Sequence, residues 1–181
     1  FYLCIGMSSI NIPESVESIG NQAFFVCSNM QIPVTFSTSA TTIGQQAFQA
    51  SGITSVYLPA SITTIYDDSF RECANLTNII VSDGNSKYES VGGALVEKTA
   101  ENKKKLTTCP QMLTGTFTIP NDIDYIADFA FYGCKHLTNI TFASSSKVSS
   151  IGTSAFAGCT GIKSLTVPDG VITINNEAFD N

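Results

Sequence analysis

Six cysteines and a single histidine are the residues of this 181-residue chain that could bind a metal or form covalent bonds. The sequence does not predict a zinc site, because no two cysteines follow the Cys-x-x-Cys spacing and His136 is the one histidine. Five of the cysteines instead occupy one position of a repeat, three residues after a phenylalanine: Cys4, Cys27, Cys73, Cys134 and Cys159. A position shared in this way indicates a packing role.

Disulfides between neighbouring repeats stay open as an alternative. Equivalent Cα atoms of stacked coils lie about 5 Å apart, which is inside the range of about 4.4–6.8 Å that a disulfide spans. Cys4/Cys27 and Cys134/Cys159 could therefore be bonded. Equivalent side chains of parallel coils point the same way, which disfavours the required torsion and favours buried free thiols. Cys109 lies outside this column of cysteines.

Acidic pairs are the other candidates for a chemical site. Asp67/Asp68 and Asp122/Asp124 are too sparse for a calcium loop. The sequence contains no phosphate-binding loop, nucleophile elbow or catalytic dyad, and no motif places a serine or carboxylate beside His136. We therefore expect no catalytic residues, no bound metal and no cofactor, and we predict that the chain is not an enzyme.

All these residues are positioned by a repeated apolar pattern, whose clearest copies follow the form IxIPxSVxxIGxxAFxxCxxL. Residues 10–30, 56–76 and 117–137 match this form best. Counted from the phenylalanine of the Ala-Phe pair, successive copies are separated by 23, 24, 22, 61, 25 and 23 residues. A fixed period of about 20–50 residues predicts a solenoid, in which each coil is stable only against its neighbours. The long gap predicts one enlarged coil.

Each copy predicts two short strands on different walls of its coil. Val56 and Leu58 illustrate the first strand, because apolar residues two apart give a strand with one buried face. Pro59 ends that strand, and the apolar pair Ile62/Ile65 predicts the second. The phenylalanines of successive coils should lie on one another, and the small residue before each predicts a 3₁₀ or short helical turn. The first strand is expected at residues 10–12, 34–36, 56–58, 79–81, 117–119, 140–142 and 165–167.

The pattern resembles the BspA-like leucine-rich repeats of bacterial and protozoan surface proteins, over essentially the whole chain. This resemblance implies one leucine-rich-repeat domain over residues 1–181, with about seven coils that are partial at both ends. The expected fold is a right-handed superhelix of stacked coils, mostly β, with short parallel strands. Residues 82–118 resemble the lengthened repeat of that family. Residues 94–96 and 106–108 are predicted to pair around a polar turn at 99–105, with Gly115 at the return.

Composition narrows the classes of partner. The chain has 43% hydrophobic and only 13% charged residues, with a net charge of −6. An acidic chain lacks the clustered basic face that nucleic acid requires, so we expect no nucleic-acid partner. No apolar run approaches the roughly 18 residues of a membrane helix, so we expect no membrane insertion in this segment.

Two sets of residues are left free by the packing of the repeat. Lys103, Lys104 and Lys105 belong to the predicted hairpin turn, where they form either a solvated tip or an interaction site on a protruding loop. Tyr57 and Ile80 are expected to be neighbours among the outward positions of the first strands, and an aromatic anchor is typical of interfaces. The candidate protein-binding positions of these strands are Ser55, Tyr57, Asn78, Ile80, Thr118, Asn139 and Thr141.

The resemblance implies a secreted or cell-surface module that binds protein, for adhesion to a host or for contact between cells. The expected partner is a host extracellular-matrix protein or another cell-surface protein. The alternative is a structural spacer without a ligand of its own. An enzyme built on a parallel β-helix would need clustered Asp, Lys or Arg across neighbouring coils, where this chain has Ser, Thr and Asn.

Overall fold

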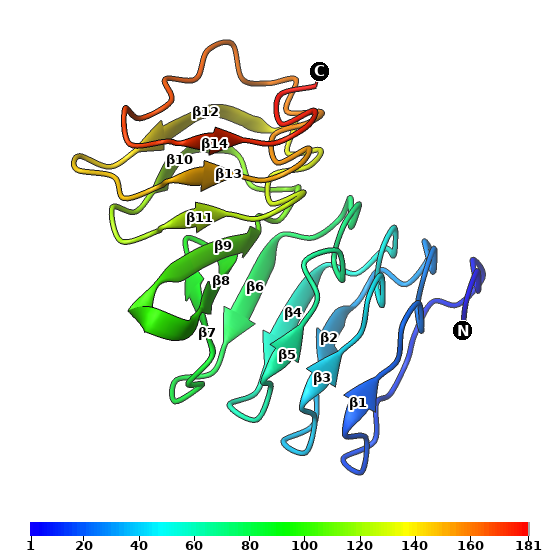
Figure 1. Cartoon of the computed structure of the whole chain (residues 1–181). Coiled ribbons are helices and arrows are strands. Elements are labelled where there is room, and N and C mark those ends of the chain that lie inside the picture. The colour runs from blue at the N-terminus through cyan, green and yellow to red at the C-terminus, as the bar shows by residue number, and fades with distance from the viewer. Residues whose placement is uncertain (181) are drawn as a thin grey trace.

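The computed structural model describes residues 1–180, which wind into a stack of about seven coils with almost no helix. The first and last coils lie at the two ends of the stack (Figure 1). The strands are β1 Ser18–Ile19, β2 Pro33–Thr35, β3 Thr42–Ile43, β4 Ser55–Leu58, β5 Thr64–Ile65, β6 Asn78–Val81, β7 Tyr88–Val91, β8 Ala94–Lys98, β9 Lys104–Thr108, β10 Gly115–Ile119, β11 Tyr125–Ile126, β12 Leu137–Phe142, β13 Ser150–Ile151 and β14 Thr173–Ile174. A single 3₁₀ turn, η1 Ala100–Asn102, is assigned among the described residues.

The coils pair through two walls of short strands. On the first wall β2, β4 and β6 form one parallel sheet, and β10 pairs with β12 in a second. On the second wall β1, β3 and β5 are parallel, and β9, β11, β13 and β14 continue it beyond the enlarged coil. The prediction of a parallel-stranded solenoid is confirmed. Both walls are interrupted at the enlarged coil.

The turns that contain the phenylalanines form a third wall. Phe24 and Phe48 stack with ring centroids 5.0 Å apart, and Phe131 and Phe156 repeat this spacing. The predicted phenylalanine column is thus confirmed, in one part from Phe1 to Phe70 and another from Phe131 to Phe179.

These turns are not the helical or 3₁₀ segments that the sequence led us to expect. Alternate N–H groups bond to the next coil, as from Phe24 to the Ala47 carbonyl at 2.7 Å, and so cannot continue a helix. Gln22 and Val26, which flank Phe24, have φ of 56° and 55°. The left-handed backbone at these positions breaks the run of turns and directs alternate N–H groups along the stack.

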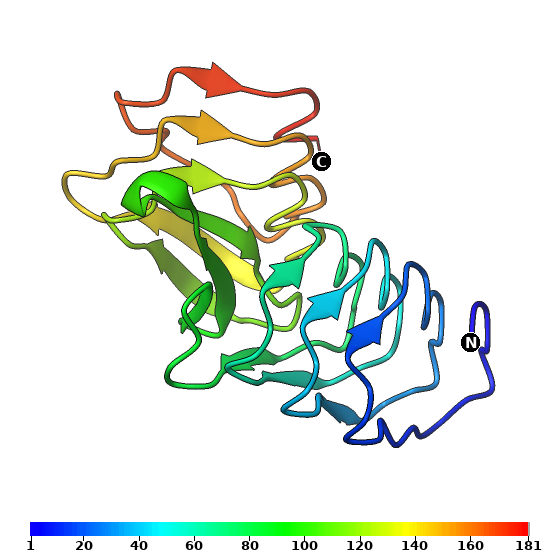
Figure 2. The same ribbon diagram turned by 60° about the horizontal axis from the view of Figure 1, so that its bottom comes forward.

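The enlarged coil contains an antiparallel sheet of β7, β8 and β9, seen in green between the two halves of the stack in Figure 2. The predicted pairing of residues 94–96 with 106–108 is confirmed, with a shift in register between Leu95 and Val96. The polar turn is shorter than expected, because Lys104 and Lys105 belong to β9. Strand β7 was not predicted. Gly115 has φ of +77°, which suits its predicted place at the return.

Strand β8 separates two hydrophobic cores. Leu95 packs with the N-terminal core, which runs from Ile19 to Tyr88, whereas Ala94 and Val96 pack with the C-terminal core. All three side chains are fully buried. Because successive side chains of a strand point to opposite faces, this one strand closes the core of each half of the solenoid.

Two of the predicted first-wall strands do not form. Residues 10–12 and 165–167, in the first and last coils, have no ladder partners, although each carries the alternating apolar pattern. The alternating pattern predicts which side chains face inward. Hydrogen bonds of a ladder also require the neighbouring coil to lie at the distance between paired strands. The predicted outward positions lie in two separate sheets, β2-β4-β6 and β10-β12.

Candidate binding surface

The outward face of β4 and β6 brings together four of the predicted residues. Tyr57 is opposite Ile80 and Ser55 is opposite Asn78 in the parallel register, so the predicted neighbours are indeed adjacent. The Tyr57 side chain is 41% exposed although its strand lies in the middle of its sheet. Val56 and Ile79 point inward and are fully buried, so the strand alternation holds this pair outward.

The other predicted strand residues form a separate patch on β10 and β12. Thr118 is opposite Thr141, and their hydroxyl oxygens are 3.0 Å apart. Asn139 is opposite Thr116 in the same ladder. This patch consists of small hydroxyl and amide side chains, in contrast to the aromatic and aliphatic pair on β4 and β6.

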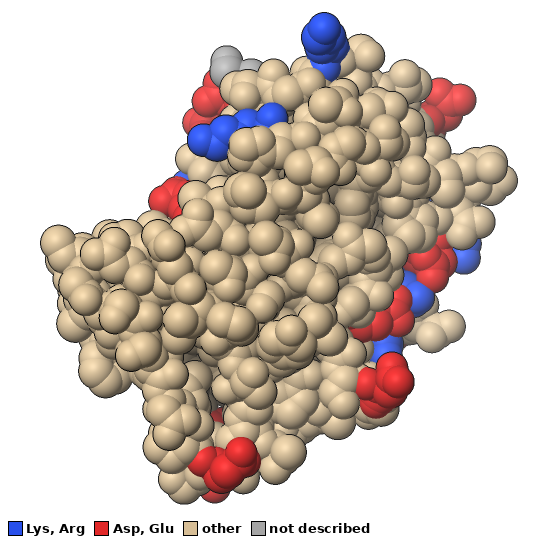
Figure 3. Space-filling view, turned by 180° about the vertical axis from the view of Figure 1, so that it is seen from behind, with Lys and Arg blue, Asp and Glu red and all other residues tan. Residues whose placement is uncertain are grey.

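The turn between β7 and β8 lies between the two patches. The N–H of Ile79 donates to the Gly93 carbonyl at 3.0 Å. The Ser90 hydroxyl donates to the Ile79 carbonyl and accepts from the N–H of Val81, both at 2.8 Å. These hydrogen bonds occupy backbone groups on the edge of β6 that does not pair with β4. Figure 3 shows the broad centre of this side of the molecule free of Lys, Arg, Asp and Glu, which lie near its margins.

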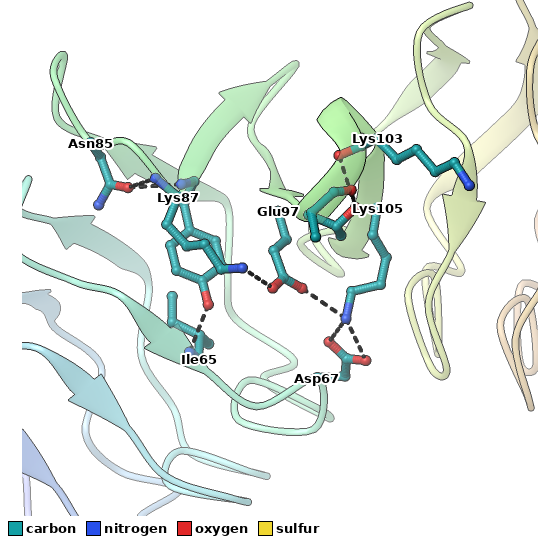
Figure 4. Close-up of polar contacts among 10 residues, drawn as sticks. Ile65, Asp67, Asn85, Lys87, Glu97, Lys103 and Lys105 are labelled. Atoms are coloured by element: carbon teal, nitrogen blue, oxygen red, sulfur yellow. Dashed lines mark hydrogen bonds and ion pairs between the residues drawn. The ribbon is translucent and has the colours of Figure 1, made fainter.

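Two of the three lysines of the hairpin, Lys104 and Lys105, each contact two carboxylates on the second wall. Figure 4 shows Lys105 Nζ between Glu97 at 2.8 Å and Asp67 at 3.1 Å. Lys104 Nζ contacts Glu89 at 2.7 Å and also Asp122. Lys104 and Lys105 are therefore paired cations, and whether any of the three lysines contacts a partner stays a prediction.

Lys103 has the most exposed side chain of the three. Its Nζ lies 3.3 Å from Glu101 and 5.6 Å from the centroid of the Tyr125 ring. A hydrogen bond with Tyr125 and the contact with Glu101 raise the pKa of Lys103. The cation thus stays charged at neutral pH at the tip of the hairpin.

A groove of about 540 Å³ adjoins the β10–β12 patch, and sequence reasoning did not predict it. Asn139 and Thr141 line one side, and Ser164 and Thr166 line the other. Asn139 and Thr141 were predicted as outward positions, but the groove also depends on how far the last coil lies from β12. No sequence pattern predicts the distance between the last coil and β12.

The cysteine column is buried between coils except at Cys4, which is half-buried, and all six cysteines are free. The Cys159 thiol donates to the Phe131 carbonyl at 3.0 Å, and the Cys73 thiol donates to the Phe48 carbonyl at the same distance. Burial raises the pKa of Cys73 and of Cys159 to about 12. These thiols stay protonated at neutral pH and act as packed hydrogen-bond donors. Within residues 1–180, no cluster of three His, Cys, Asp or Glu residues is arranged to hold a metal ion.

The family model for the BspA type leucine rich repeat region matches residues 1–99 and 107–181, in six copies. The chain belongs to the BspA-type leucine-rich repeat family. Its fold is the leucine-rich-repeat solenoid, and the resemblance seen in the sequence is confirmed. Leucine-rich repeats are typically non-enzymatic and generally bind proteins. No match was found among the curated proteins.

Solved structures of bacterial leucine-rich-repeat proteins are similar to this chain. A leucine rich cell surface protein from Faecalibacterium prausnitzii A2-165 is 28% identical, with a TM-score of 0.73 over 93% of this chain and 50% of that one. The pneumococcal vaccine antigen PcpA is 20% identical, with a TM-score of 0.66 over 91% of this chain and 51% of that one. The chain thus spans about half the length of these structures. No helix among residues 1–180 is long and apolar enough to cross a membrane.

Proposed function

We propose that this chain is a cell-surface or secreted module that binds protein partners in adhesion, through the first-wall face of β4 and β6. The single observation that supports this most strongly is the pair of an exposed Tyr57 and a half-buried Ile80, held outward on an uncharged face. Aromatic side chains anchor interfaces because they bury a large area with few rotatable bonds. Membership in the family and the similarity to a cell surface protein support the location and the class of partner.

Capture of purified extracellular-matrix proteins and of epithelial or bacterial surfaces tests the proposal. The Tyr57→Ala/Ile80→Ala variant should bind at least tenfold more weakly, because truncating anchor residues of this kind costs about 2 kcal/mol or more. Tyr66→Ala is a matched control, because Tyr66 is similarly exposed, at 45%, but follows β5 on the second wall.

Equal binding by both variants would contradict the assignment of the β4–β6 face. In that case Lys103→Ala would show whether the hairpin tip is the contact instead. If the wild-type chain retains none of the matrix proteins and surfaces, the proposed function is wrong and a structural spacer remains.

A further inference from the structure

On the first wall, the last coil lies apart from the coil before it. On the second wall its strand β14 pairs with β13, Ser150 with Thr173 and Ile151 with Ile174. On the third wall the N–H of Phe156 donates to the Ala178 carbonyl at 2.7 Å. On the first wall, no backbone hydrogen bond joins residues 163–167 to β12 within the described chain. Figure 1 shows this orange segment arching away from β12.

This opening leaves one edge of β12 and residues 163–167 facing each other without backbone hydrogen bonds between them. Strand β12 pairs with β10 along one edge, and its other edge has no strand beside it among residues 1–180. The backbone N–H and C=O groups of such an edge are a template for another extended chain. The groove of about 540 Å³ lies along this edge, between β12 and Ser164, Thr166 and Pro168.

The size and charge of the groove limit what can occupy it. A residue in a sheet takes about 3.3 Å along the strand, about 4.8 Å across it and about 10 Å through the layer. The groove therefore accommodates about three to four residues of extended chain. Asp169 is the single ionisable residue among the described residues that line it. An uncharged segment fits this environment, because a buried charge without a partner is costly.

We propose that the groove binds an uncharged, extended segment of a protein partner, which adds as a strand to the free edge of β12. This inference rests on the proposed function and names the kind of segment that the partner supplies. The groove adjoins Asn139 and Thr141 of the β10–β12 patch, on the same wall as the Tyr57/Ile80 pair. Main-chain bonds to β12 supply the attachment, and the hydroxyl side chains of the groove contact alternate residues of the segment.

A phage-displayed library of linear heptapeptides, selected on the whole chain, provides the probe. Selected sequences should be uncharged over three to four consecutive residues. A synthetic copy should slow amide hydrogen exchange in β12, and N-methylation of its alternate residues should weaken binding at least tenfold. Ser164→Trp places a large ring in the groove and should weaken binding at least tenfold. Ser9→Trp is the matched control, because Ser9 occupies the equivalent exposed repeat position in the first coil.

Three results would overturn the proposal. Slow exchange of the outer-edge amides of β12 in the free chain would show that the last coil closes on β12. Protection of β12 that rises with protein concentration alone would identify a second copy of the chain as the occupant. Equal binding of the peptide to both tryptophan variants would place it elsewhere. If the Tyr57→Ala/Ile80→Ala variant loses its surface partner while Ser164→Trp keeps the peptide, the proposed function stands and this inference fails.

Discussion

Asp67 and Glu97 share the ammonium group of Lys105 but respond to it in opposite ways. Burial opposes ionisation of Glu97, yet hydrogen bonds from Lys105 and Lys87 outweigh it and lower the pKa of Glu97. Burial raises the pKa of Asp67 by more than the attraction of Lys105 lowers it, and the negative charges of Glu97 and Asp128 add to the rise. At the scale of single residues, Glu97 stabilises the hairpin sheet as an anion, whereas burial disfavours the ionised form of Asp67.

The two carboxylates should therefore contribute to stability with opposite dependence on pH. The lowered pKa of Glu97 means that its contribution is present above the pKa of an unfolded glutamate and is lost as the pH falls through the folded value. Glu97→Gln should cost about 1–2 kcal/mol at pH 7, because its side chain is 16% exposed and pairs with two lysines. The cost should begin to shrink as the pH falls below about 4.3, the ordinary pKa of a glutamate.

Asp67→Asn is the matched comparison. Because the pKa of Asp67 is raised, the fold favours its neutral form, and this contribution is lost as the pH rises through the folded value. An uncharged amide should then cost less than about 1 kcal/mol at pH 7. Urea unfolding of both variants measures how their free energies of unfolding differ. A range from about pH 3 to about pH 8 covers the titration of carboxylates. A larger cost for Asp67→Asn than for Glu97→Gln at pH 7 would contradict this account.

The Asn85 side chain makes four hydrogen bonds that join the coil of β5 to the hairpin, and we expect its removal to destabilise the fold. Its amide nitrogen donates to the Pro59 and Ile62 carbonyls at 2.9 and 3.0 Å. Its oxygen accepts from the N–H groups of Lys87 and Tyr88 at 2.8 and 2.7 Å. Asn85→Ala should lower the free energy of unfolding by about 2–4 kcal/mol, because buried partners are left unsatisfied. Asn29→Ala, at an exposed turn, should change it by less than about 0.5 kcal/mol in the same denaturant titration.

At the scale of elements, the hairpin β7–β9 replaces the ladder bonds that the two walls lack at the joint. The Tyr88 hydroxyl accepts from the N–H of Ile65 at 2.8 Å, which ties β5 to β7. On the third wall the Arg71 guanidinium lies 4.1 Å from the centroid of the Phe129 ring. These side chains add to the few backbone hydrogen bonds that join the two halves, such as the one from the Met112 N–H to the Leu76 carbonyl at 3.0 Å.

The division into two cores predicts that a core defect in one half leaves the other folded. Phe131 is fully buried and stacks on Phe156. Phe131→Ala should cost about 3–5 kcal/mol and remove amide protection from β10 to β14. The strands β1 to β6 should keep theirs. Phe179→Ala is the control, because Phe179 is 38% exposed and stacks on one ring only. Simultaneous loss of protection in both halves of the Phe131→Ala variant would show that the cores are a single unit.

The strand pattern and the phenylalanine column could be predicted because each follows from a local rule repeated along the chain. Val56/Leu58 alternate, and Phe24 recurs at the solenoid period. The separation of residues 165–167 from β12 could not be predicted, because it depends on the path of the whole coil. The pairing of Lys105 with Asp67 was also missed. These residues are far apart in sequence, and no periodicity relates them.

At the scale of the whole molecule, the three walls have different characters. The second wall carries the paired charges of the hairpin, and the third carries the stacked rings and buried thiols. The first wall is uncharged over its broad centre (Figure 3). It holds both patches of predicted binding residues, one on each side of the β7–β8 turn. A partner that contacts both patches has to span that turn, which favours a large protein surface over a small ligand.

Hydrogen exchange of the chain with and without a captured surface protein tests the central claim most directly. We predict that the partner slows exchange in β4 and β6, and in β10 and β12 when it spans the turn. Exchange in β11, β13 and the hairpin tip at Lys103 should stay unchanged, because they lie on the second wall. Slower exchange confined to the second wall, with β4 and β6 unaffected, would contradict the account.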